Sequence, residues 1–385
     1  MKAFKLKEGV FWVGAIDHNP PNFGPSLSKG TTYNSYLISD DTTALIDTVK
    51  HGFTQENLLR INDVTNISNI DYVIIGNYCM DHSGSLPFLM KRAKNATIVT
   101  TDDSKKAIEK YHNGKWNFEI VRDGDSINLG KTNLLFREFK LNDNEILLTY
   151  LKEDNILFSG DLFSQHVASY NRMDTDIEKL EFDALSYFVN YLSPINRLPD
   201  LNDIEVLAPN HGFIWFEGVE KIIEKYQSWI KGKSKNKFTL IYSSTWRGTE
   251  KMAYAIADGV GRTGTEVEVI NYEKMDTGYI LTKLFESKSI AVGCPSFKNS
   301  VPPEISKLFH YLKLLGLRNK SLTLFTCYSD RQSPIPQLLE LTPNLNFELI
   351  DWPLEVQYAP SEEEINLCYE LGIRIGERTK NNKEE

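Results

Sequence analysis

Residues 74–87 read IIGNYCMDHSGSLP, an apolar segment typical of a buried strand followed by a loop that holds Asp81 and His82 side by side. A carboxylate next to an imidazole is a common pair of metal ligands. Asn77 and Cys79 stand just before this pair, where more ligands would be expected. The stretch therefore predicts a metal site at the end of a strand, with unusual neighbours.

Two later strand-like segments also end at residues that bind metals. Asp161 follows one of them in SGDLF, and His211 follows another in APNHGF. Read singly, Asp81 could cap a helix, Asp161 could serve a turn, and either histidine could be a hydrogen-bonded core group. Together, three strand-end loops of this kind can meet at one pole of a sandwich, so we predict that Asp81, His82, Asp161 and His211 bind iron or zinc.

The first half of the chain is rich in short strand-like runs, at residues 10–16, 32–39, 43–48, 72–76, 97–101, 146–151, 155–160 and 205–210. Helical patterns at residues 52–63 and 180–192 lie between some of them. This mixture indicates sheets covered by helices rather than a pure sandwich. A polar, lysine-rich run at residues 231–237 predicts a linker, and we expect domains at 1–235 and 236–385.

After the linker, strand-like segments at 238–244, 266–272, 289–296, 321–329 and 347–354 alternate with helical ones at 249–260, 280–287, 302–316, 334–341 and 361–377. Five strand–helix units in succession predict a doubly wound parallel sheet. Ligands of such sheets bind beyond the carboxyl ends of the strands.

The loop after the first of these strands is rich in hydroxyl groups and opens a helix, which is typical of a phosphate site as well as of a simple capped turn. The loops after the next two strands, CPSFKNS and TCYSDRQ, would converge on the same edge and offer aromatic rings. Flavin mononucleotide (FMN) fits all three loops. The candidate FMN-binding residues are Ser244, Thr245, Trp246, Arg247, Gly248, Thr249, Pro295, Ser296, Phe297, Asn299, Cys327 and Tyr328.

From Phe238 onward the chain resembles a flavodoxin domain. It departs from the usual loop in having Arg247 where glycine is common and Gly248 where asparagine is common. The segments GVFWVGAIDHN, GTTYNSYLISDDTTALIDTVK, DHSGSLP, ILFSGDLFSQHVAS and LAPNHGFIW resemble, in order, the metallo-β-lactamase-like half of the flavodiiron proteins, or A-type flavoproteins. The resemblance implies an αββα sandwich followed by a flavodoxin-like domain, in a chain of mixed α/β and α+β class.

In that family, two irons bridged by a carboxylate reduce dioxygen to water or nitric oxide to nitrous oxide with electrons from FMN. Its motif H-x-E-x-D-H, the bridging aspartate and the last histidine match this chain at Asp81, His82, Asp161 and His211. The ligands of the other iron do not match, because the chain has Asn77, Cys79 and Asn142 at their positions.

The resemblance therefore implies one or two irons, with zinc as an alternative metal. Because amides are weak ligands, the second iron should bind weakly or be absent. Cys79 is either a thiolate ligand or a small buried thiol that fills space. Tyr78 and His166 are expected near the pocket.

We expect an oxidoreductase of the flavodiiron type, with activity altered or reduced by the replaced ligands. Its partners would be dioxygen or nitric oxide and a separate electron donor such as a rubredoxin or a reductase, because no rubredoxin-like cysteine pairs follow the flavodoxin part. A head-to-tail homodimer or a dimer of dimers is implied by the resemblance. Two alternatives stay open: a non-catalytic FMN electron-transfer protein with a vestigial metal domain, and a mononuclear metal hydrolase.

The composition narrows the choice of partners and location. A formal net charge of −9 argues against nucleic acid or an anionic membrane as the main partner. No apolar run reaches the length of a membrane span, and four scattered cysteines do not form a disulfide framework. We therefore expect a cytoplasmic protein with reduced thiols.

Overall fold

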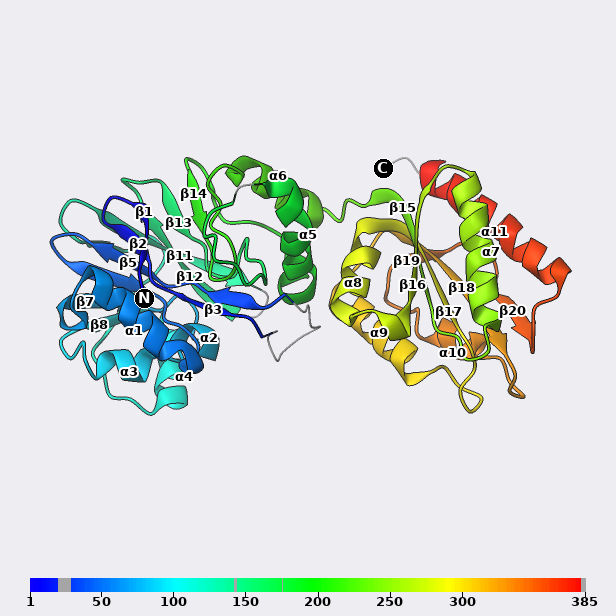
Figure 1. The fold of residues 1–385 in the computed structure, drawn as a ribbon, viewed down its shortest axis with the longest axis horizontal. Helices are drawn as coiled ribbons and strands as arrows, with labels where there is room; N and C mark the ends of the chain where they lie inside the picture. Colours follow the sequence, from blue (N-terminus) through cyan, green and yellow to red (C-terminus); the bar gives the residue numbers. More distant parts are fainter. Residues whose placement is uncertain (20–28, 142–143, 175, 382–385) are drawn as a thin grey trace. The chain divides into compact units, whose positions relative to one another are not determined.

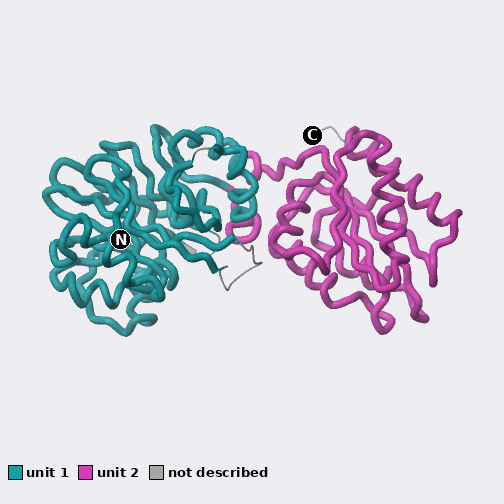
Figure 2. The backbone as a smooth tube through the Cα atoms, in the orientation of Figure 1, with its two compact units in different colours: residues 1–22, 27–188, 197–227 teal, residues 23–26, 189–196, 228–385 magenta. Residues whose placement is uncertain are grey.

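The structure is a computed structural model that describes residues 1–19, 29–141, 144–174 and 176–381 (Figure 1). It forms two compact units, which are described separately (Figure 2). The first contains residues 29–188 and 197–227 with the N-terminal strands, and the second contains residues 189–196 and 228–381. Among the described helices, none combines the length and the apolar character needed to span a bilayer.

Two sheets form the centre of the first unit. The larger has seven strands in the order β1 (Phe4–Lys7), β2 (Val10–Trp12), β5 (Tyr36–Ser39), β6 (Thr43–Ile46), β7 (Ile70–Ile74), β8 (Thr97–Thr100) and β9 (Phe118–Ile120). The second has the order β10 (Ser126–Asn128), β11 (Asn133–Leu141), β12 (Asn144–Leu151), β13 (Ile156–Phe158) and β14 (Val206–Ala208). A short pair, β3 (Ala15–Asp17) and β4 (Thr31–Tyr33), stands apart from both.

Alternation of side chains along the strands places the two sheets face to face. Ala44 and Ile46 of β6 lie in one core cluster together with Phe136 and Phe158 of the second sheet. Leu45, between them, points to the opposite face and packs in a second cluster under the helices. The predicted αββα sandwich is thereby confirmed.

The helices of this unit are α1 (Thr54–Val64), α2 (Met80–Ser83), α3 (Leu86–Met90), α4 (Asp102–His112), α5 (Ile177–Tyr187) and α6 (Val219–Ile230). Side chains of α1, α3 and α4 cover the outer face of the larger sheet. Tyr226 of α6 packs against Phe163, in the loop after β13, and against Phe188 after α5. Sequence reasoning missed β11, because charged residues interrupt the apolar pattern of its NLLFREFKL segment.

The second unit is a parallel sheet in the order β16 (Glu266–Asn271), β15 (Lys235–Tyr242), β17 (Ser287–Cys294), β18 (Lys320–Tyr328) and β19 (Phe347–Leu349). Its helices are α7 (Gly248–Arg262), α8 (Thr277–Glu286), α9 (Pro303–Leu314), α10 (Ile335–Glu340) and α11 (Glu362–Asn381). The strand that comes first along the chain, β15, lies between β16 and β17 in the sheet. This order is that of a doubly wound flavodoxin-like fold, as predicted.

Two details differ from the expectation. The segment 347–354 was predicted as one strand, but β19 ends at Leu349 and a separate strand, β20 (Leu354–Gln357), follows. Asp351 between them has a left-handed φ of 60°, which breaks the extended backbone. The predicted linker at 231–237 is too long, since α6 ends at Ile230 and β15 already begins at Lys235.

The lysines at the start of β15 form ion pairs with glutamates of neighbouring elements. Lys235 pairs with Glu286 at 2.7 Å, and Lys237, which is buried, pairs with Glu268. The polar composition of this stretch therefore reflects a partly buried ion-pair cluster as well as a connection. The expected domain limits of 1–235 and 236–385 stay a prediction.

Lys320 at the start of β18 is buried in the same region. Its ammonium group donates to Ser234 Oγ at 2.9 Å and to the carbonyl oxygens of Phe285 and Ser287 at 2.8 and 2.6 Å. Burial lowers the pKa of Lys320 to about 7, against an opposing effect of Glu286. Above pH 7 the folded chain therefore releases a proton that the unfolded chain keeps up to the ordinary lysine value of 10.5.

This difference predicts how stability depends on pH. Between pH 7 and pH 10 the unfolded state binds more protons, so the free energy of unfolding should rise with pH. The Lys320→Met variant should lose roughly 2–4 kcal/mol of that rise. Urea denaturation at both pH values measures it, with the exposed Lys307→Met variant of α9 as control. Equal pH dependence in wild type and Lys320→Met would contradict the assignment.

Candidate functional site

The loop after β7 presents two of the predicted metal ligands from a short helix. Asp81 and His82 lie in α2, where the backbone N–H of His82 donates to the carbonyl of Cys79 at 2.9 Å. The carbonyl of His82 accepts from both the N–H and the hydroxyl of Thr48, at 2.8 and 2.7 Å. These bonds attach the ligand loop to the end of β6.

The loops after β13 and β14 supply the other two ligands. They are joined by a bond from the N–H of Asn210 to the carbonyl of Gly160 at 2.8 Å, which holds Asp161 next to His211. His211 donates its Nδ1 proton to the carbonyl of Thr32 at 2.6 Å. This bond selects the tautomer in which Nε2 carries the lone pair, as a metal ligand requires.

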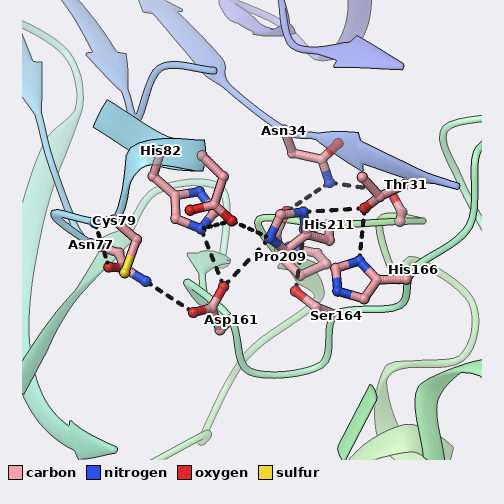
Figure 3. A network of polar contacts seen from close by, with 12 residues as sticks. Thr31, Asn34, Asn77, Cys79, His82, Asp161, Ser164, His166, Pro209 and His211 are labelled. Atoms are coloured by element: carbon pink, nitrogen blue, oxygen red, sulfur yellow. Dashed lines mark hydrogen bonds and ion pairs between the residues drawn. The ribbon is translucent and has the colours of Figure 1, made fainter. Parts of the chain in front are cut away.

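Polar atoms of the four side chains lie close together, and Figure 3 shows His82, Asp161 and His211 among them. His82 Nε2 lies 3.4 Å from Asp81 Oδ2 and 3.5 Å from Asp161 Oδ1. His211 Nε2 lies 3.5 Å from Asp81 Oδ2 and 3.8 Å from Asp161 Oδ1. A tetrahedral ion with bonds of about 2.1 Å places its ligand atoms roughly 3.4 Å apart, and the distances from each imidazole to the two carboxylates are close to this value. Asp81, His82 and His211 form a group with all ligand atoms within 4.8 Å of one another, and Asp161 lies beside it.

Opposite charges hold this cluster together. Burial opposes the charged form of His82, but the carboxylates of Asp81 and Asp161 raise its pKa to about 10. Burial likewise opposes both carboxylates, yet the imidazoles hold the pKa of Asp81 and that of Asp161 below the usual range. The pocket thus favours a cation between two carboxylates, which a divalent metal supplies more fully than a proton.

A buried atom supports the same conclusion. Asp161 Oδ1 has no hydrogen-bond donor among the described residues, although its neighbours are within ion-pair distance. A buried carboxylate oxygen without a donor is costly, and a metal ion is the usual partner that removes this cost. The residues present therefore fit one metal ion.

Residues around His211 complete the pocket, and of those described next only His166 was expected there from sequence. Thr31 Oγ1 lies 2.9 Å from His166 Nδ1 and 3.4 Å from His211 Nδ1, which places His166 beside the site without making it a ligand. The rings of Tyr33 and Tyr187 each lie 5.9 Å from the His211 ring. The sequence offered one indication of these residues: Thr31 to Tyr33 lie at the beginning of the strand predicted at 32–39.

The residues that replace the other iron's ligands behave differently from one another. Asn77 is buried and donates from Nδ2 to Asp161 Oδ2 at 2.9 Å. The expectation of a buried, space-filling Cys79 is wrong, because the residue is exposed after the turn that leads into α2. Loss of water around the sulfur and the nearby carboxylates of Asp81 and Asp161 still raise its pKa to about 12. Asn142 lies outside the described residues.

In the second unit, the three predicted flavin loops lie at one edge of the sheet. β15, β17 and β18 are parallel, with Tyr242 opposite Gly293 and Cys294 opposite Thr326, so their carboxyl ends align. Asn299 receives a bond from Arg331 at its side chain and donates its own N–H to Asp330, at 3.0 and 2.7 Å. These bonds connect the second and third loops.

The first loop has the features of a phosphate cradle. Arg247 takes a left-handed φ of 63° at the start of α7, which explains why glycine is the easier choice at this position. The side chain of the cap residue Arg247 does not cap α7, and Ser244 Oγ accepts only a long bond of 3.4 Å from the N–H of Glu250. The hydroxyls of Ser243 and Ser296 have no hydrogen-bond partner within the described ranges. Free amides and hydroxyls at a helix N-terminus fit a phosphate group.

Trp246 and Phe297 are 87% and 52% exposed at these loops, and Tyr328 is half-buried at the end of β18. Aromatic rings left in solvent at the edge of a parallel sheet are suited to contact a flat ligand. Cys327 lies against the first loop, since its sulfur donates to the carbonyl of Tyr358 at 3.3 Å close to Gly248. That these residues bind FMN stays a prediction.

Comparisons with known proteins agree with this division. Residues 31–212 match the model of the ODP family beta lactamase, and residues 240–372 match that of flavodoxin. A nitric oxide reductase of Moorella thermoacetica is 34% identical over 97% of this chain and 98% of its own length.

Two solved structures are similar over nearly the whole chain. Rubredoxin oxygen:oxidoreductase from Desulfovibrio gigas has a TM-score of 0.92 and 27% identity, with 98% of this chain and 99% of that chain covered. The flavodiiron protein from Giardia intestinalis has a TM-score of 0.93 and 26% identity, with 99% and 97% covered.

The close approach of Gly248 and Cys327 yields a prediction on flavin binding. A Cβ at position 248 would lie 2.3 Å from the Cys327 sulfur, so Gly248→Ala should displace the loop and weaken FMN binding about tenfold or more. Flavin fluorescence titration of the apoprotein measures it. Gly261→Ala in the same helix is the control, because its added Cβ meets nothing within 4 Å. Unchanged affinity in Gly248→Ala would place the phosphate elsewhere.

The metal site yields a second prediction. Cobalt(II) at a hundredfold excess over its dissociation constant should stabilise the wild-type fold by about 2.7 kcal/mol, because the ion binds only the folded state. His211→Ala should lose most of this gain, and the exposed His310→Ala should keep it. Thermal melting with and without metal is the measurement. A gain that persists in His211→Ala would exclude this histidine from the site.

Proposed function

This chain belongs to the flavodiiron protein family, and we propose that it is an oxidoreductase that reduces dioxygen or nitric oxide with electrons from FMN. The observation that carries the proposal is the convergence of Asp81, His82, Asp161 and His211 at metal-ligand spacing. A chain that used only its flavin would have no need of four largely buried ionisable side chains around one point.

When bound, FMN supplies electrons and a metal at the four side chains supplies a place for a diatomic gas to be reduced. The contribution of the protein is to keep the ligands ready. Thr32 holds His211 with Nε2 facing the carboxylates, and Thr48 holds the backbone of His82. Ligands fixed in this way need little rearrangement when an ion enters.

Both reductions consume protons, and a row of polar residues leads from the site toward solvent. The Tyr33 hydroxyl donates to Asp17 Oδ2 at 3.0 Å, and the half-exposed Lys50 lies 3.6 Å from the same oxygen. Burial and the carboxylate of Asp17 raise the pKa of Tyr33 above its ordinary range. Tyr33 therefore keeps its proton at neutral pH, and its hydroxyl holds the Asp17 carboxylate while its ring lies 5.9 Å from the His211 ring.

The proposal also includes the partners of the reaction. Relatives whose names specify rubredoxin or nitric oxide support a separate redox protein as the electron donor and one of the two gases as substrate. A head-to-tail homodimer in the cytoplasm, in which the flavin of one chain serves the metal site of the other, completes the proposed arrangement.

Gas consumption tests the function. Protein loaded with FMN and iron, reduced by light with a sacrificial donor, should consume nitric oxide or dioxygen faster than the same protein without metal. Loss of a contact behind a ligand costs up to about 100-fold, so His82→Ala, which removes a ligand itself, should lower the rate by at least about that factor.

His310→Ala should leave the rate unchanged, since its side chain is exposed on α9. Equal rates in wild type and His82→Ala, or no consumption of either gas by the loaded wild type, would contradict the proposal. Flavin reduction and re-oxidation without metal dependence would instead favour a simple electron carrier.

A further inference from the structure

Asn77 contacts the aspartate that the family uses as a bridge between two irons. Its Nδ2 donates to Asp161 Oδ2 at 2.9 Å, while Asp161 Oδ1 faces His82 and His211 (Figure 3). The two oxygens of this carboxylate therefore have different partners. One is directed to the four-ligand site, and the other is bound by an amide.

The orientation of the amide follows from partners that each allow only one role. A carboxylate oxygen can only accept, so the NH2 group of Asn77 must face Asp161. The backbone N–H of Cys79 can only donate, and it reaches Asn77 Oδ1 at 3.0 Å. A flipped amide would lose both bonds and turn its oxygen toward a carboxylate oxygen, so the observed orientation is strongly preferred.

An NH2 group that points at Asp161 Oδ2 cannot be a metal ligand, because the amide nitrogen has no free lone pair to offer. It does what a cation would otherwise do there, since its polarised hydrogens compensate the negative oxygen. We infer that the Asn77 amide takes the place of the second metal ion and that this chain holds a single metal ion at Asp81, His82, Asp161 and His211.

The remaining side chains agree with one ion. Within the described residues, Asp81, His82 and His211 offer ligand atoms that all lie within 4.8 Å of one another, and neither Cys79 nor Asp161 belongs to that group. Asp161 joins the site through Oδ1, which lies 3.5 and 3.8 Å from the two imidazoles. Among the family positions that the structure describes, a second ion would find one sulfur and one carboxylate oxygen that already accepts an N–H. These are fewer protein ligands than the three or four that a protein-bound ion usually has.

Charge supports the same count. The carboxylates of Asp81 and Asp161 carry the charge that one divalent ion balances, with the two imidazoles as neutral ligands. A second divalent ion would lack the glutamate ligand of the family, because Cys79 stands at its position. The further buried carboxylate of Asp47 already accepts the N–H of Gly76 at 2.9 Å and is not among the grouped ligands. The neutral amide of Asn77 gives Asp161 Oδ2 a hydrogen-bond donor without changing the net charge of the site.

Metal content of the full chain tests the inference. The protein is purified without oxygen and dialysed against excess ferrous iron or cobalt(II), and bound metal is measured by elemental analysis. We expect about one ion per chain at saturation. Cobalt(II) should give the electron paramagnetic resonance spectrum of an isolated ion, whereas two cobalt ions sharing a carboxylate would couple. Two ions per chain, a coupled pair, or no bound ion would each overturn the inference.

A substitution at position 77 sharpens the test. Asn77→Asp keeps the shape of the side chain but replaces the donor with a carboxylate, so it should raise the bound cobalt toward about two ions per chain. Asn95→Asp is the matched control, because it makes the same change in charge at an exposed position. Unchanged stoichiometry in a folded Asn77→Asp protein would show that the amide does not decide the count.

The inference relies on the proposed function only for the identity of the site, and the two can fail separately. One ion per chain without gas consumption supports the single-ion site and contradicts the function. Two ions with gas consumption support the function and overturn the single-ion site. If Asn77→Asp does not fold, the stoichiometry and the spectrum of the wild type still decide.

Discussion

The first unit depends on one electrostatic constraint, which is that two buried carboxylates must share positive charge. Asp81 and Asp161 come from loops on different sheets, and each would be costly to bury alone. His82 and His211 lie within ion-pair distance of both, so the four side chains stabilise one another only when all the loops are in place. A divalent cation would satisfy the same constraint better than protonated imidazole does.

The hydrogen bond from Asn77 to Asp161 reduces the positive charge that the two carboxylates need from metal ions. In a bridging carboxylate, both oxygens face a cation, whereas here one oxygen already has an N–H donor. An amide compensates part of a charge without adding one, and the site therefore reaches balance with fewer metal ions. A relative's fold and most of its ligands can thus be retained while the number of ions that the pocket can hold is reduced.

The second unit is governed by backbone geometry at the end of its parallel sheet. Strands β15, β17 and β18 end together, and the first loop turns sharply enough to bring Gly248 against the Cys327 side chain. Arg247 accepts a left-handed backbone conformation there, at a cost of about 1 kcal/mol that the surrounding loop must offset. Such local strain is usually kept where a loop must approach a ligand closely.

Periodicity and residue type predicted sheets covered by helices in the first part of the chain, a doubly wound parallel sheet in the second and four candidate metal ligands, whereas the αββα sandwich was implied by the family resemblance. Alternating apolar residues in strands such as β6 and the regular strand–helix units after Phe238 are local patterns, and local patterns survive in a single sequence. The exceptions were segments in which charge obscured the pattern, as in β11 and at the lysines that begin β15.

Only the tertiary structure decided how distant residues serve the site. The bonds from His211 to Thr32 and from Asn77 to Asp161 join residues 179 and 84 positions apart, and no local pattern encodes such pairs. The direction of the Asn77 amide and the exposure of Cys79 depend on neighbours from other loops. Sequence therefore identified the residues that can bind a metal, whereas the fold determined which oxygen of Asp161 is left free to bind one.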